Sequence, residues 1–68
     1  MNPEKAIDDL KAAKSILVKT RRDWATALGK VNVRSESERA IENFVRVQAA
    51  IEAIDRAIED EVSASGSV

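Results

Sequence analysis

Residues 28–38 read LGKVNVRSESE, and this short junction decides how the chain folds. Gly29 suits the position just after a helix, where a left-handed backbone conformation is often needed. Ser35 and Glu38 fit a capping box. In this motif the serine hydroxyl accepts a hydrogen bond from the backbone amide of the glutamate, and the glutamate side chain accepts one from the backbone amide of the serine. We therefore expect one helix to end before Gly29, another to begin after Ser35, and a turn over about 29–35.

Both flanks of this junction favour long helices. Asn2-Pro3-Glu4 combines a helix-capping residue, a proline suited to the first helical position and an acidic residue for the positive helix end. Apart from Gly29, no glycine or proline follows until Gly66. The sequence thus predicts a hairpin over residues 1–62, with helices at about 3–28 and 36–62. The small polar residues 63–68 are expected to form a flexible tail.

Apolar residues in both predicted helices recur at alternating spacings of three and four, which is the heptad seam of a coiled coil. Folding the chain about Asn32 brings small residues opposite large ones along this seam, as close packing requires. The predicted fold class is all-α: a two-helix antiparallel hairpin, coiled-coil-like. The seam residues are Ala6, Leu10, Ala13, Leu17, Thr20, Trp24, Ala27 and Val31, then Ala40, Phe44, Val47, Ile51, Ile54 and Ile58.

A chain of 68 residues without cysteine or histidine needs stabilisation from outside its own core. Cores of this size rarely supply more than about 3–5 kcal/mol, and neither disulfides nor the usual soft metal ligands are present. We expect no metal and no cofactor. Self-association is the remaining solution, as a four-helix bundle or a larger ring. Apolar residues beside the seam supply the predicted oligomer interface: Ile7, Ile16, Val18, Leu28, Ile41 and Val45.

Charge is divided between the halves of the chain. Residues 1–34 hold eight basic and four acidic side chains, whereas residues 35–68 hold three basic and eight acidic ones. The basic side chains of the first helix can cover the edge of the core and pair with Gln48, Glu52 or Asp55. Alternatively they bind phosphate, since arginine offers a fork and lysine a point charge. The candidate phosphate ligands are Lys14, Arg21, Arg22 and Arg34.

Enzymatic chemistry finds little support in this composition. The commonest general base and the best nucleophile are missing, and there is no glycine-rich phosphate loop. No segment has the length and apolarity of a membrane span, and the first residues lack the pattern of a signal peptide. We therefore expect a non-enzymatic, cytoplasmic protein with no catalytic residues.

Residues 54–58, Ile-Asp-Arg-Ala-Ile, carry a family resemblance. They resemble the aliphatic-Asn-Arg-Ala-aliphatic ending of the second helix in phage sponge proteins, which sequester the cyclic nucleotide signals of bacterial immunity (anti-CBASS and anti-Thoeris proteins). Asp55 replaces the asparagine, and the similarity covers about residues 39–58. The resemblance implies an anti-defence phage protein: an oligomeric, non-enzymatic binder of cyclic di- or trinucleotides.

Three functional hypotheses follow. The first is a small helical interaction protein that self-associates and acts by binding a protein partner. The second is a sponge that holds cyclic nucleotides at subunit boundaries. The third is an RNA-binding four-helix dimer, similar to the hairpin regulators of plasmid copy number. A net charge of −1 argues against nucleic acid, whose nonspecific binding depends on neutralising phosphates.

Overall fold

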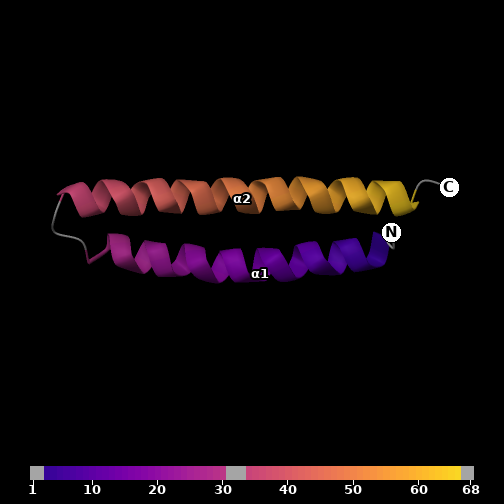
Figure 1. Ribbon diagram of the computed structural model, residues 1–68, viewed down its shortest axis with the longest axis horizontal. Coiled ribbons are helices and arrows are strands. Elements are labelled where there is room, and N and C mark those ends of the chain that lie inside the picture. The colour runs from indigo at the N-terminus through magenta and orange to yellow at the C-terminus, as the bar shows by residue number, and fades with distance from the viewer. Residues whose placement is uncertain (1–2, 31–33, 67–68) are drawn as a thin grey trace.

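The computed structural model describes residues 3–30 and 34–66, with side chains described for residues 4–30 and 37–64. Two helices, α1 (Pro3–Leu28) and α2 (Arg34–Gly66), run antiparallel and pack against each other along their length (Figure 1). The described residues form no strand. The all-α hairpin predicted from the heptad pattern is therefore confirmed.

The first helix has the predicted bounds, but the second is longer at both ends. It begins at Arg34 and continues to Gly66, rather than covering about 36–62. Residues 63–66 are thus helical, and this part of the predicted flexible tail is corrected. Once a helix is nucleated, each further residue adds a hydrogen bond at small cost, and no proline stops it here. The start at Arg34 places Ser35 inside the helix, not before it; the Ser35 side chain of the predicted capping box lies outside the described residues.

The end of α1 also differs from the prediction. Gly29 does not have a positive φ angle, so the left-handed cap does not form. Instead, the Gly29 amide donates to the Ala25 carbonyl at 3.3 Å and the Lys30 amide donates to the Ala27 carbonyl at 3.0 Å. The second of these bonds spans three residues, so the last turn tightens in the 3₁₀ manner. These two hydrogen bonds satisfy carbonyl groups at the helix end that would otherwise be hydrogen-bonded through a left-handed glycine cap.

The core is a single line of contact between the two helices. Only two described side chains, Ala40 and Ile51, are buried, at 2% and 4% exposure. Both belong to the predicted seam, whose other described residues are half-buried. The polar seam residue Thr20 donates its hydroxyl to the Ile16 carbonyl at 3.1 Å, so it enters the seam with its donor satisfied. A two-helix core cannot cover its own flanks, which leaves apolar surface on both sides.

The molecule is far more extended than a compact domain of its size. Its Cα extents are 54 × 15 × 14 Å and its radius of gyration is 15.6 Å. A globular chain of this length would have a radius of gyration of about 11 Å. The accessible surface is 5248 Å², against about 4,200 Å² for a compact monomer of the same mass. The hairpin therefore exposes an excess of surface. Neither described helix contains a stretch apolar and long enough to cross a lipid bilayer.

Candidate functional site

Two polar bridges join the helices on one side of the seam. Lys14 Nζ lies 2.6 Å from Asp55 Oδ1, and the Arg21 guanidinium donates to Gln48 Oε1 at 2.7 Å. The two residues on each helix are seven apart, or two helical turns, so both bridges lie on the same side of the hairpin. These contacts fix which face of each helix meets the other.

The direction of the side chains explains how the bridges form. In the predicted register Leu10 lies opposite Ile54, which leaves the Lys14 and Asp55 backbones about five residues, or about 7.5 Å, apart along the axis. Side chains on a helix lean toward its N-terminus. In antiparallel helices, Lys14 and Asp55 therefore lean toward each other and close this gap. The bridges agree with the register derived from the seam.

The same two-turn spacing extends this side of the hairpin in both directions. Ile7 and Leu28 continue the row of Lys14 and Arg21 on α1. We call this surface the bridged face. A second row on each helix lies farther from the seam and includes Val18 on α1 and Val45 on α2. The row on α2 continues from Gln48 and Asp55 to Ile41 and Val62, and the bridged face thus carries the aliphatic residues Ile7, Val18, Leu28, Ile41, Val45 and Val62.

Much of this aliphatic surface is open to solvent. Ile41 is 49% exposed, Val62 51% and Val45 57%. Ile7, Val18 and Leu28 are half-buried. Large exposed apolar side chains that gather on one face are typical of a protein interaction surface. The bridged face consequently has apolar ends and a centre in which two polar bridges are already formed.

The structure separates one predicted interface residue from the other five. Ile16, 67% exposed, lies two residues beyond Lys14 and therefore on the opposite edge of the seam. It does not share a surface with the bridged face. Val62 does share it but is not among the predicted interface residues, because the second helix is predicted to end at about this residue. Its two-turn spacing from Asp55 was the signal that could have found it.

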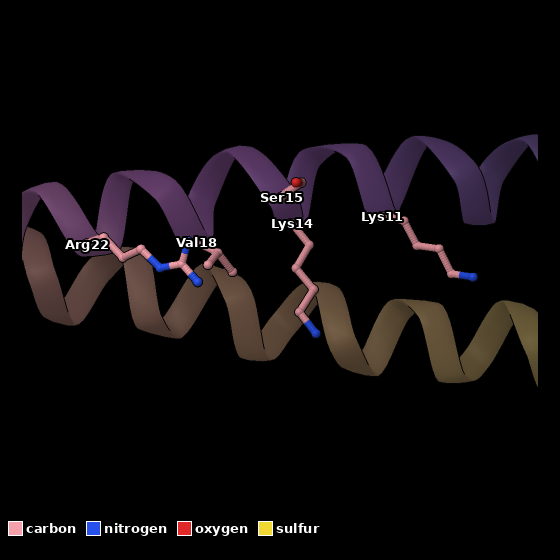
Figure 2. A pocket seen from close by; sticks show the side chains of 5 residues that line it. All are labelled: Lys11, Lys14, Ser15, Val18 and Arg22. Atoms are coloured by element: carbon pink, nitrogen blue, oxygen red, sulfur yellow. The ribbon is translucent and has the colours of Figure 1, made fainter.

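A shallow, open groove of about 370 Å³ runs along α1 and overlaps the α1 edge of the bridged face. Three of its five lining residues are cationic, and one carries a hydroxyl. Figure 2 shows that Lys14 reaches across toward α2, whereas Lys11 extends away from the other four residues. The charged ends are thus spread along the groove. The lining residues are Lys11, Lys14, Ser15, Val18 and Arg22.

The four predicted phosphate ligands fall into three situations. Lys14 and Arg21 are engaged in the bridges to α2, which is the predicted alternative in which they cover the core edge. Arg22 lines the groove and is exposed. The side chain of Arg34 lies outside the described residues. Lys11 was not among the four, although the structure places it in the groove with Arg22.

The described part of the chain offers neither a cluster of metal ligands nor a buried polar side-chain atom without a partner. Within it, no three acidic side chains gather closely enough to hold a metal ion. No described side chain carries a buried polar atom without a hydrogen-bond partner. The features that remain for functional interpretation are the bridged face and the cationic groove.

The comparisons with known proteins do not add a family. The sequence matches no family model, and no curated protein or solved structure is significantly similar to it. Functional interpretation therefore depends on the geometry of the hairpin itself.

Proposed function

We propose that this protein is a non-enzymatic helical interaction module that self-associates through its bridged face and acts by occupying a protein partner. The observation that carries the proposal is the group of half-exposed aliphatic residues on that face, Ile41, Val45 and Val62. Burying them against another molecule would remove apolar surface from water at about 25 cal/mol per Å². We further propose that it acts in the cytoplasm.

The amount of surplus surface fits an association of ordinary size. The hairpin exposes 5248 Å², about 1,000 Å² more than a compact monomer of its mass would expose. One partner in a standard protein–protein interface contributes about 800 Å². A core with only Ala40 and Ile51 fully buried gains little stability alone. Association would therefore stabilise the fold as well as perform the function.

Native mass spectrometry of the protein purified from its host tests this proposal. It reports the number of subunits and any retained partner or small ligand in one measurement. We expect multiples of the 7.4 kDa chain at micromolar concentration. A population that stays monomeric across the accessible concentration range, while circular dichroism shows it folded, would contradict self-association.

The cationic groove supports a second candidate function, the binding of a phosphate-containing ligand. Lys11 and Arg22 line it together with the Ser15 hydroxyl. Both cations are exposed, so an anion could engage them without breaking the Lys14–Asp55 bridge. The ligand class would be the cyclic nucleotides that the resemblance of residues 54–58 implies. The spread of the charged ends makes this the weaker candidate, because phosphate recognition gains most from converging donors.

RNA binding by a four-helix dimer remains a hypothesis without a comparable feature. The bridged face joins a basic helix to an acidic one, and the whole chain has a net charge of −1. A phosphate backbone laid along such a face would meet carboxylates as often as cations. We do not favour this alternative.

A further inference from the structure

The charges of the bridged face are sorted by helix. On α1 this face carries the basic residues Lys11, Lys14 and Arg21, with Glu4 as its one acidic residue. Among the α2 residues whose side chains the structure describes, 37–64, this face carries four acidic residues and no basic one. The two long edges of one face thus differ in sign along most of their length. The acidic residues on the α2 edge are Glu38, Glu52, Asp55 and Glu59.

Two symmetric arrangements can bring the bridged faces of two copies together, because a twofold axis must lie within the interface. If the axis runs along the hairpin, α1 of one copy lies on α2 of the other and both turns are at the same end. If the axis runs across the hairpin, α1 lies on α1, α2 lies on α2 and the turns are at opposite ends. The sorted charges discriminate between these arrangements.

We propose that a second copy of this chain docks on the bridged face with α1 on α2, as a four-helix bundle whose turns lie at the same end. This inference rests on the proposed self-association and specifies its geometry. Both partner surfaces are the same face, so the interface is self-complementary. Its footprint, from extents of 54 × 15 Å, is about 800 Å² per copy, the contribution expected of one partner in a standard interface.

The register of this bundle brings compatible residues together. Rotation about an axis along the hairpin leaves every residue at the same position along that axis. Residues of α1 and α2 that are level with each other within one hairpin are therefore also level across the interface. Lys11 then lies between Glu52 and Glu59 of the second copy, and Val18 lies level with Val45 of the second copy. Each contact occurs twice by symmetry. Opposite charges and aliphatic residues thus meet at successive positions along the outer rows of the interface.

The arrangement with its axis across the hairpin, which we call the crossed bundle, brings incompatible residues together. With the axis at the middle of α1, near Ile16, Lys11 approaches Arg21 of the second copy and Lys14 approaches Val18. On the other helix, Glu52 approaches Val45 of the second copy. Like charges along an interface repel, and an aliphatic residue packed against a charge removes water from that charge without supplying an opposite charge. The crossed bundle is therefore disfavoured by the same side chains that favour the same-end bundle.

Pulsed electron spin resonance on the full chain with one nitroxide label tests the geometry. A label on Lys30→Cys, beside the turn, should give an intermolecular distance below about 25 Å in the same-end bundle, where only the width of the bundle and the label linkers separate the two sites. In the crossed bundle the two labels would be about 40 Å apart along the axis. A label on Ser15→Cys, halfway along α1, gives a short distance in both arrangements and so reports assembly alone.

The pair of labels separates failure of this inference from failure of the proposed function. Short distances at both sites support the same-end bundle. A short distance for Ser15→Cys with a long one for Lys30→Cys overturns this inference and leaves self-association standing. No dipolar modulation from either label overturns both. Circular dichroism of each labelled variant, matched to that of the unlabelled chain, shows that the hairpin is intact.

Discussion

Lys14 and Asp55 meet at 2.6 Å although the seam leaves their backbones at different heights along the hairpin. The contact exists because the two side chains lean toward each other from antiparallel helices. Arg21 and Gln48 repeat the relationship two turns away. These two bridges identify the side of the hairpin on which most of the surplus aliphatic residues lie, and the functional proposals depend on that assignment.

The Lys14–Asp55 bridge should contribute little to stability on its own. Its side chains are 39% and 44% exposed, and exposed ion pairs are worth about 0–1 kcal/mol. A double-mutant cycle with Lys14→Gln and Asp55→Asn, measured by urea unfolding at concentrations that keep the chain monomeric, should give a coupling energy below about 1 kcal/mol that falls with added salt. A coupling of several kcal/mol in the monomer that is insensitive to salt would contradict the exposure of this pair in the single hairpin.

The seam should be much more sensitive than the outer surface. Ile51 is 4% exposed, and truncating a buried isoleucine to alanine costs about 2–5 kcal/mol. Ile51→Ala should therefore unfold much of the population at room temperature. Arg46→Ala, at an exposed position of the same helix, should change the melting temperature little. If thermal melts ranked these two variants in the reverse order, the seam assignment would be wrong.

Replacement of Gly29 by alanine should stabilise the hairpin. Gly29 lacks a positive φ angle, and an added Cβ would meet only the Thr26 and Ala25 carbonyl oxygens at 3.6 and 3.9 Å. The substitution mainly restricts the unfolded chain, which is worth about 0.4–1 kcal/mol. Chemical denaturation of the two proteins measures the difference. A loss of stability would instead indicate the left-handed cap expected from the sequence.

Anion binding in the groove predicts a ligand-dependent gain in stability. The melting temperature should rise with the concentration of a cyclic dinucleotide or trinucleotide, and the rise should shrink with salt. It should vanish in Lys11→Gln/Arg22→Gln. A control variant with the same net charge, Lys19→Gln/Arg39→Gln, should keep the effect because both of its sites lie outside the groove. Calorimetry that detects no heat with any cyclic nucleotide would remove this candidate.

The sequence was sufficient to predict the hairpin because the heptad spacing and the junction at residues 28–38 agree with each other. It was insufficient at Gly29, since glycine tolerates both the left-handed and the helical backbone. Surplus apolar residues could be recognised, but their division between the two edges depends on the helix register. Ile16 was therefore grouped with residues from which the structure separates it. Val62 was missed because the small residues after it suggested a frayed end, whereas α2 continues to Gly66.

The orientation of the bundle offers one further prediction. If Lys11 lies between acidic residues of a second copy, Lys11→Glu should weaken the dimer several-fold at low salt, because charge reversal at an interface replaces attraction by repulsion. Adding Glu52→Lys should restore part of the affinity. Sedimentation velocity of the single and double variants measures this. A dimer equally stable in all forms would contradict the pairing of α1 with α2 across the interface.

The most direct test of self-association through the bridged face is sedimentation equilibrium of the wild type beside two matched variants. Val45→Asp places a charge on the bridged face, and Ile16→Asp places the same charge on the opposite edge, where the side chain is 67% exposed. We predict that the wild type and Ile16→Asp form the same oligomer at micromolar concentration. The dissociation constant of Val45→Asp should be at least about tenfold higher, as burial of an unpaired charge requires. Equal dissociation constants for the two variants, or a folded wild type that stays monomeric, would contradict the account.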